Sequence, residues 1–373
     1  MKRGKASALI VLALVLEGGV LLLWQISSAS TTRLLLPSPG PAASVTTPPS
    51  TSGALTISSK VDFGCSLPMT VYSHRVLVSL PRGGITFNEP QPSASPGASG
   101  GSSYIGRRWL SVPPAWVSPD GGSYASLVGA SDGSGFDAIV SRNATGTQRQ
   151  LWKGSGHPTI VGWSSSGLYF LLQPSSSDPR GVPALWVVDP DNPDLAQKVG
   201  PNPLFAAAGV GPRPVFSADT KLSGDTAWDT LRNSDDKLDR VQRMDVQTGS
   251  VSIWYTAPSG ARVSILGFDG QEHPVLQLTS ASSTTPQALM LLTGDDQTQS
   301  IAGAQGQAEG FTNAFADTHG VWIGSSGVLW LYRNGSLFKV TDVPIGQILT
   351  DSSARNAAGS LQAPAVVGPC AKA

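Results

Sequence analysis

The chain has 373 residues, of which 40% are hydrophobic and only 13% are charged. Basic and acidic residues balance at 25 each, so no net positive charge supports nucleic-acid binding. The 42 glycines and 29 prolines are typical of short strands joined by tight turns rather than of surface helices, and the length allows one large all-β domain or two ordinary ones.

The N-terminus predicts a membrane anchor. Three basic residues within the first five precede a run of 21 mostly apolar residues, Ala6 to Ile26. A run of this length can span the hydrocarbon layer as one helix, and the basic cluster holds its start in the cytoplasm. We expect residues 1–26 to form a cytoplasmic tip and an uncleaved transmembrane signal anchor, with the folded domain outside the cytoplasm. Cleavage near Ser28 or Ser30 is the alternative.

Glu17 interrupts the apolar run. A lone carboxylate inside a bilayer is costly when ionised, so we expect Glu17 to be protonated or paired with a neighbouring helix. A tolerated polar residue in a marginal anchor is the simpler interpretation.

Two segments are dominated by small and polar residues. Residues 27–59 are rich in serine, threonine, proline and alanine, and residues 91–103 resemble them. Such segments bury too little apolar area to offset their ordering entropy. We therefore predict a stalk at 27–59 and a folded domain at 60–373, with a disordered surface loop at 91–103 inside that domain.

The folded part is organised around a repeated unit. AWVSPDGGSYASLVGA, at 115–130, places an aromatic residue before a polar turn and an apolar strand, and the unit recurs in weaker form at steps of 47 to 53 residues. The aromatic residues that mark it are Trp116, Trp163, Phe216, Phe268 and Phe315. A period near 50 with strand-only patterning predicts a β-propeller, because four short strands and their turns use roughly 40 to 50 residues.

The last repeat predicts its strands most clearly. FTNAFAD, GVWIG, VLWLYR and SLFKV are four apolar runs separated by short turns, and Asn334-Gly335 between the last two predicts a type I′ hairpin. After Val340 we expect one or two further strands, at 347–350 and 363–367, which are too few for a blade of their own.

The AWVSPDG segment resembles the WD40-like repeats of TolB-type and dipeptidyl-peptidase-type propellers, over roughly residues 104–340. The resemblance implies that Asp120 and Gly121 make the tight turn between the first two strands of a blade. The peptidases of that group carry a separate α/β-hydrolase domain, for which we expect no room here.

The chain has two cysteines, Cys65 before the first predicted strand and Cys370 near the end. Outside the cytoplasm they can form a disulfide that closes a ring whose last blade takes strands from both chain ends. We predict six blades, or seven if residues 206–238 contain extra strands. A redox-active pair is the alternative, but neither cysteine has a basic neighbour or a C-x-x-C partner.

No linear motif predicts a catalytic, cofactor-binding or metal site. A G-x-S-x-G motif at Gly129, Ser131 and Gly133 leads into the strand FDAIV, whereas a nucleophile elbow leads into a helix. The histidines are scattered singly and form no zinc-binding pair, which leaves four isolated residues, His74, His157, His273 and His319.

Two acidic clusters lack the glycine and distal glutamate of a calcium loop. They are Asp189, Asp191 and Asp194, and Asp235, Asp236 and Asp239. Two asparagines, Asn143 and Asn334, fit glycosylation acceptors, although hairpin-turn chemistry already explains Asn334.

Eight of the ten tryptophans fall into two groups. Six lie in predicted strands, where large rings fill the space between blades: Trp116, Trp163, Trp186, Trp254, Trp322 and Trp330. Trp109 and Trp228 lie outside the strong strands, and an alternative use for them is as aromatic platforms for sugars or peptides.

These observations predict a membrane-anchored, extracytoplasmic β-propeller that acts as a binding or scaffolding module for a protein, peptide or glycan, without a cofactor. The alternative is a glycan-active hydrolase or lyase, because propellers can assemble sites from several blades that leave no linear motif. A third possibility is a sensor or subunit that works beside a membrane partner, for which Glu17 is the hint.

Overall fold

We describe a computed structural model of the chain. The residues that it describes are 51–71, 74–87, 101–130, 135–143, 146–154, 156–173, 184–199, 220–232, 238–247, 250–280, 286–301, 310–325, 327–343 and 364–372. They belong to one compact unit, Pro49–Ala373. Within them no helix is long and apolar enough to cross a membrane. The predicted anchor at 6–26, with Glu17, lies outside the described residues.

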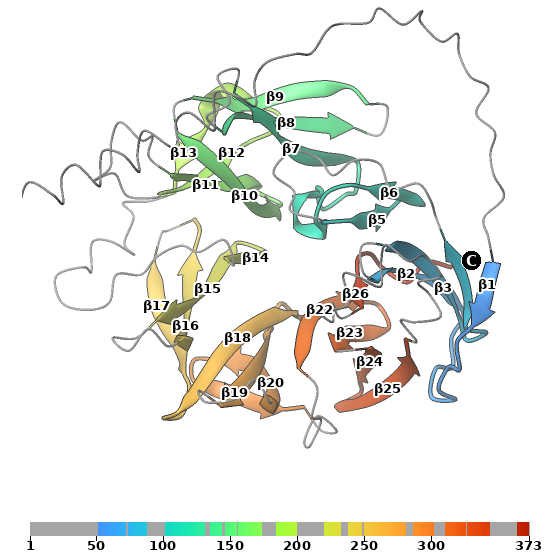
Figure 1. The fold of residues 1–373 in the computed structure, drawn as a ribbon. Coiled ribbons are helices and arrows are strands. Elements are labelled where there is room, and N and C mark those ends of the chain that lie inside the picture. Colours follow the sequence, from blue (N-terminus) through green and yellow to red (C-terminus); the bar gives the residue numbers. More distant parts are fainter. Residues whose placement is uncertain are drawn as a thin grey trace, which may run out of the picture. The chain divides into compact units, whose positions relative to one another are not determined.

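The unit is built from antiparallel sheets, most of them four-stranded (Figure 1). The closing sheet has the order β1-β4-β3-β2-β26 and contains β1 (Thr51–Ala54), β2 (Cys65–Val71), β3 (His74–Leu80), β4 (Gly84–Phe87) and β26 (Ala365–Val366). A small hairpin follows, formed by β5 (Ser103–Ile105) and β6 (Arg108–Leu110). The second sheet is three-stranded and contains β7 (Ser123–Gly129), β8 (Phe136–Asn143) and β9 (Gln148–Lys153).

Four sheets of four strands follow, each formed by consecutive strands in chain order. The third sheet contains β10 (His157–Ser164), β11 (Gly167–Gln173), β12 (Ala184–Val188) and β13 (Gln197–Lys198). The fourth contains β14 (Lys221–Ser223), β15 (Thr226–Arg232), β16 (Leu238–Asp245) and β17 (Val251–Thr256). The fifth contains β18 (Ala261–Phe268), β19 (Pro274–Ser280), β20 (Pro286–Gly294) and β21 (Gln297–Ser300). The sixth contains β22 (Phe311–Asp317), β23 (Gly320–Ser325), β24 (Val328–Arg333) and β25 (Ser336–Asp342).

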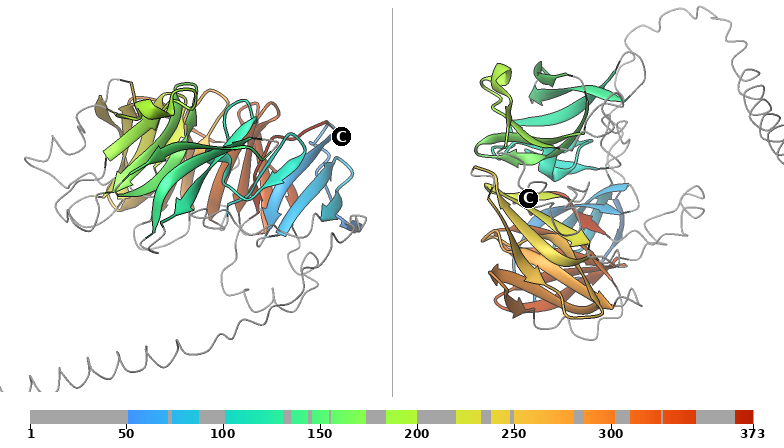
Figure 2. Two further views of the ribbon diagram at one scale, coloured as in Figure 1. Left: turned by 90° about the horizontal axis from the view of Figure 1, so that it is seen from above. Right: turned by 90° about the vertical axis from the view of Figure 1, so that its left-hand side faces the viewer.

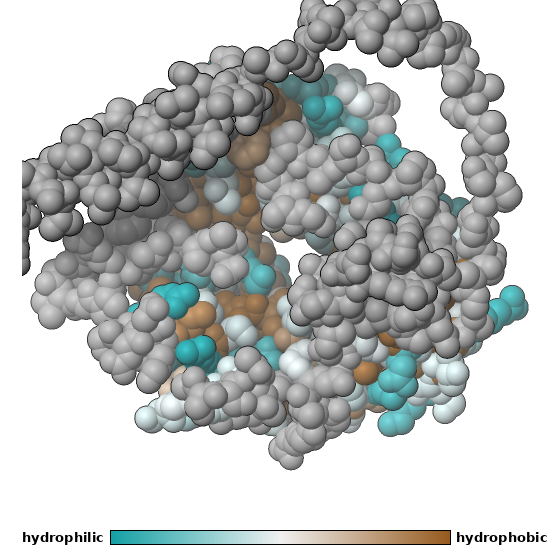
Figure 3. Space-filling model, viewed as in Figure 1, coloured by the Kyte–Doolittle hydropathy of each residue, from teal (hydrophilic) through white to brown (hydrophobic). Residues whose placement is uncertain are grey.

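From the second sheet to the sixth, and from the sixth to the closing sheet, neighbouring sheets pack face to face with an apolar cluster between them. One cluster joins the fifth and sixth sheets through Val275 and Ile323, and others join the third to the fourth and the fourth to the fifth. Figure 2 shows the sheets of this unit as a single layer, each tilted against its neighbour. On the face seen in Figure 3, apolar residues gather toward the interior and hydrophilic residues along the outer edge. Consecutive four-stranded sheets with cores between them are the architecture of a β-propeller.

The first strands of neighbouring sheets lie side by side, β18 against β22 and β10 against β14. A glycine makes the first of these contacts possible: a side chain at Gly267 would collide with the backbone carbonyl of Ala314. Because strands in each sheet alternate in direction, the turns after the first and third strands lie on one face, which we call the turn face.

The closing sheet takes strands from both ends of the unit, as the sequence predicts. β26 pairs with β2 through Met69–Val366 and Thr70–Ala365, and Ser66 bridges Ala371. The disulfide between Cys65 and Cys370 joins residues 305 positions apart, with their Cα atoms 5.5 Å apart. In other sheets a short turn joins the first strand to the second, whereas here the disulfide holds the two together.

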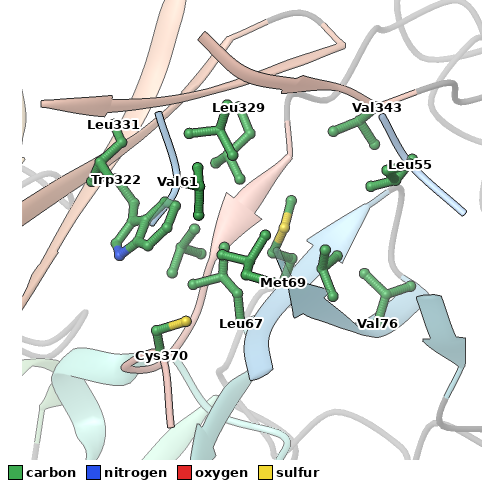
Figure 4. Close-up of a cluster of buried hydrophobic side chains, with 14 of the residues drawn as sticks. Leu55, Val61, Leu67, Met69, Val76, Trp322, Leu329, Leu331, Val343 and Cys370 are labelled. Atoms are coloured by element: carbon green, nitrogen blue, oxygen red, sulfur yellow. The ribbon is translucent and has the colours of Figure 1, made fainter. Parts of the chain in front are cut away.

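The core between the sixth and closing sheets is the largest cluster (Figure 4). Trp322 of β23 is fully buried against apolar residues of β2 and β3, and the half-cystine Cys370 lies in the same cluster. The predicted use of Trp322 as a filler between blades is therefore confirmed. The predicted hairpin is confirmed as well, because Asn334 and Gly335 have φ values of 52° and 76°.

The turn of the defining repeat has the expected chemistry. Asp120 accepts hydrogen bonds from the Ser118 hydroxyl (2.6 Å) and the Gly122 amide (2.9 Å), and Gly121 has a φ of 69°. The first strand of this second sheet is irregular, however. Pro113 and Pro114 lack a backbone N–H, so this stretch forms the 3-10 turn η1 (Pro114–Trp116) and one bridge from Val117 to Tyr124. Trp116 thus lies in a turn and not in the predicted strand.

Three sequence-based boundaries need correction. The predicted loop at 91–103 extends too far, because Ser102 and Ser103 are buried and β5 begins at Ser103. The turn between the first two strands of the fourth sheet is Gly224-Asp225 and not the Ser-Ala-Asp after Phe216, because β14 carries Leu222 where other repeats carry an aromatic ring. Phe216 lies outside the described residues. At the N-terminal end, β1 pairs with β4 inside the segment expected to be stalk. Backbone pairing to a sheet edge needs no apolar side chains, which explains a strand in a polar sequence.

The β5–β6 hairpin lies between the closing and second sheets. Arg75 of β3 is buried and donates hydrogen bonds to the Ser102 hydroxyl, the Leu110 carbonyl and the Ser111 hydroxyl. Its guanidinium also lies 5.5 Å from the ring centre of Trp109. Arg75 therefore ties the closing sheet to the hairpin and to Ser111, which lies between the hairpin and η1.

Candidate functional site

A polar cavity of about 430 Å³ opens on the turn face between the fifth and sixth sheets. It is lined by two turns of neighbouring repeats and by residues of β20, β21 and β24. The polar and charged lining residues are Asp269, Gln271, His273, Thr293, Gln299, Asp317, Thr318, His319, Tyr332, Arg333 and Asn334.

The fifth-sheet wall is the turn between β18 and β19. Asp269 accepts hydrogen bonds from the backbone amides of Gln271 and His273, both at 2.8 Å. Its other oxygen lies 3.1 Å from Nδ1 of His273. The carboxylate therefore fixes both the turn and the imidazole ring.

The sixth-sheet wall is the turn between β22 and β23. Asp317 is buried, and its Oδ1 accepts a hydrogen bond from the backbone amide of His319 at 2.7 Å. Its Oδ2 accepts the backbone amide of Cys370 at 2.9 Å, so this turn also holds the C-terminal end of the fold. The His319 ring stacks on Phe63 with ring centres 4.1 Å apart.

Arg333 closes the third side of the cavity from the end of β24. Its Nη1 donates a hydrogen bond of 2.8 Å to Asp62, and its guanidinium lies 5.7 Å from the ring centre of Phe63. The hydrogen bond and the positive charge of Arg333 hold the pKa of Asp62 below its usual value. Burial raises the pKa of Tyr332, the preceding residue, and the negative charge of Asp269 adds to the effect.

The two wall carboxylates are thus engaged by the protein itself, whereas imidazole and guanidinium groups remain partly exposed. Such a site offers hydrogen-bond donors and positive charge to a ligand. Glycoside hydrolysis uses a pair of open carboxyl groups, and the two wall carboxylates do not form such a pair.

The sequence patterns did not predict that His273 and His319 share a cavity. His273 follows Asp269 by four residues, and His319 follows Asp317 by two, in the equivalent turns of consecutive repeats. This shared position was the one sequence signal that could have indicated a common site. His74 lies in β3 and His157 begins β10, so neither lines this cavity. Among the described residues no group of three or more His, Cys, Asp and Glu could hold a metal ion.

The other candidate residues have local roles or lie outside the described part. Ser131 and Gly133 lie outside it, and the strand β8 follows them as expected. Asp189 accepts hydrogen bonds from the Asp191 amide and the Asn192 side chain, which is a turn contact. Asp235 and Asp236 also lie outside the described residues, whereas Asp239 lies in β16 and Asp194 in η2 (Pro193–Leu195). The Asn143 side chain accepts the amide of Thr147 across a hairpin.

The suggestion that Trp228 forms a ligand platform is wrong. Trp228 is 4% exposed, and its ring packs edge-on against Trp254 with ring centres 5.2 Å apart. Trp109 packs against Tyr104 at 4.9 Å and lies against Arg75, so its ring supports the hairpin.

No protein-family model matches this chain, and no curated protein matches it. Solved structures with similar folds include an acylaminoacyl peptidase of Pyrococcus horikoshii, with 13% identity, a TM-score of 0.43, and coverage of 78% of this chain and 48% of that chain. The β-propeller domain of the Trilobed protease from Pyrococcus furiosus has 13% identity, a TM-score of 0.42, and coverage of 72% and 77%. An oligogalacturonate lyase in complex with manganese has 11% identity, a TM-score of 0.40, and coverage of 72% and 70%.

The chain spans about half the length of the acylaminoacyl peptidase and of a prolyl endopeptidase, 48% and 50% respectively. The resemblance is one of fold.

Proposed function

We propose that this chain is a six-bladed β-propeller, anchored in the membrane by residues 6–26 and displayed outside the cytoplasm, that acts as a binding or scaffolding module for a protein, peptide or glycan. The six blades are the closing sheet and the second to sixth sheets, with η1 as the irregular first strand of the second. The disulfide supports the placement, because such bonds persist in oxidising compartments.

One observation carries the preference for binding over catalysis: Asp269 and Asp317 are engaged by backbone amides within their own turns. A hydrolase of glycans needs one carboxyl group to donate a proton and a second to act as base or nucleophile. Carboxylates that hold turns together serve neither role. The exposed donors of the cavity remain suitable for recognising a ligand.

The experiment is to incubate the purified full-length protein with panels of peptides and oligosaccharides and to record both binding and products. Binding without turnover, weakened by replacing His273 and His319 with alanine, is expected. Turnover that is lost on Asp269→Asn would establish the hydrolase or lyase instead. A reporter fused after Ala373 that is active only in the cytoplasm would contradict the proposed placement.

A further inference from the structure

Among the ionisable side chains that line the cavity, the guanidinium and the two imidazole rings are more exposed than the carboxylates. The side chains of His273, His319 and Arg333 are 28%, 24% and 36% exposed, whereas those of Asp269 and Asp317 are 13% and 2% exposed. A ligand entering the cavity therefore meets the guanidinium and the two imidazole rings before it meets either wall carboxylate. Planar guanidinium groups bind carboxylates through charge-assisted hydrogen bonds.

The structure already contains a carboxylate on this guanidinium. Asp62 accepts a hydrogen bond from Nη1 of Arg333 at 2.8 Å, and its side chain is 68% exposed. An ion pair this open to solvent contributes little to stability and can exchange with an external partner. Asp62 thus occupies a position that a carboxylate of a ligand can take.

The aromatic rings near the cavity are covered. The His319 ring stacks on the Phe63 ring, and the guanidinium of Arg333 lies 5.7 Å from the centre of the same Phe63 ring. Tyr332 is 9% exposed. Sugars are commonly recognised by stacking on an open aromatic face. Neither Phe63 nor Tyr332 offers such a face. The cavity therefore fits the carboxylate of a peptide better than a sugar ring.

We propose that the cavity between the fifth and sixth sheets binds an acidic side chain of a peptide or protein partner, with Arg333 as its main contact and Asp62 as an internal competitor. This inference rests on the proposed binding function and names its ligand class. If it is correct, removing the charge of Asp62 strengthens binding of the acidic ligand, whereas removing the charge of Arg333 weakens it.

The test is a titration of the full-length protein at low ionic strength with a short glutamate-containing peptide, blocked at both ends, and with its glutamine counterpart. Arg333→Gln should weaken binding of the glutamate peptide by about tenfold or more. Asp62→Asn should strengthen it by about two- to fivefold, since the competing carboxylate is lost. Both positions are on the surface, so the variants are expected to fold. Arg262→Gln is the matched control, because Arg262 is an exposed arginine at the other end of β18.

Equal binding of the two peptides, or weaker binding by Asp62→Asn, would overturn the inference. Binding of neither peptide up to millimolar concentration would overturn it too. If a uronate oligosaccharide binds instead and responds to Arg333→Gln, the inference about the partner fails while the proposed binding function stands. A loss of binding in Arg262→Gln equal to that in Arg333→Gln would show general charge attraction and would also overturn it.

Discussion

The sixth sheet and the closing sheet pack against each other but differ in how the chain builds them. The sixth sheet is one continuous segment, Phe311–Asp342, whose four strands are joined by short connections. The closing sheet combines strands from residues 51–87 with β26, near the C-terminus. The two sheets share one core around Trp322, yet only the sixth is held together by local turns.

The difference shows what a local turn supplies. In the sixth sheet two residues, Thr318 and His319, connect the first strand to the second, and Asp317 fixes them. In the closing sheet β26 and β2 share only two register pairs and a bridge, and the disulfide joins their ends. The covalent bond therefore replaces the connection that the chain itself provides elsewhere.

The largest expected effect is loss of the disulfide. In the double variant Cys65→Ser/Cys370→Ser, β26 must be held by its few backbone pairs and the shared core. The chain-entropy estimate for a loop of this size is about 5–6 kcal/mol, and we expect a loss of about 3–5 kcal/mol in the free energy of unfolding. Equilibrium unfolding in urea measures it, with reduced wild-type protein as the control. A loss below about 1 kcal/mol would show that the sheet closes without the bond.

The next effect comes from the aspartates of the two cavity walls. Asp317→Asn weakens hydrogen bonds that tie the sixth-sheet turn to Cys370, and we expect a loss of about 1–3 kcal/mol. Asp269→Asn is the matched variant, because Asp269 holds the equivalent turn without contacting the chain end. Asp317→Asn should therefore be the more destabilising in thermal unfolding. Equal losses would mean that the contact with Cys370 contributes nothing.

A smaller effect is expected where the sixth sheet meets the segment before β26. A side chain at Gly324 would collide with the backbone carbonyl of Pro364. Gly324→Ala should therefore cost about 1–2 kcal/mol, through displacement of that segment. Gly270→Ala is the control, since a methyl group there meets no atom within 4 Å. If both variants unfold at the same temperature, the close approach at Gly324 is not required.

The smallest effect is a dependence on alkaline pH. Burial raises the pKa of Tyr332 in the sixth sheet, whereas the strands of the closing sheet contain no tyrosine. The folded protein then keeps this proton to higher pH than the unfolded chain, so stability falls as pH rises above about 10. Tyr332→Phe should lose less stability than wild type between about pH 9 and about pH 11. Identical losses would show that Tyr332 does not contribute.

Much of the fold could be predicted because each repeat carries its own local signal. The aromatic residue before a polar turn marks the end of a first strand at Trp163, Phe268 and Phe315. The fourth sheet was misplaced for a corresponding reason: Leu222 replaces the aromatic residue, and a nearby Ser-Ala-Asp imitates the turn. The disulfide could be predicted without knowledge of the structure, because the chain has only two cysteines.

The cavity could not be predicted in the same way. His273 and His319 are one repeat apart, and they converge only because the fifth and sixth sheets pack side by side. Arg333 lines the cavity from the end of β24, just before the Asn334-Gly335 turn. Asp62, which accepts its hydrogen bond, comes from the other end of the unit. Sequence spacing alone does not encode contacts made between sheets.

If β26 and the disulfide close this fold beside the sixth sheet, reduction should loosen both chain ends of the unit together. Hydrogen exchange of the full-length protein, oxidised and reduced, measures this. Peptides covering 65–71 and 364–371 should exchange slowly when oxidised and rapidly when reduced, while 311–325 stays protected in both states. Rapid exchange of 364–371 in the oxidised protein, or no change on reduction, would contradict closure by β26 and the disulfide.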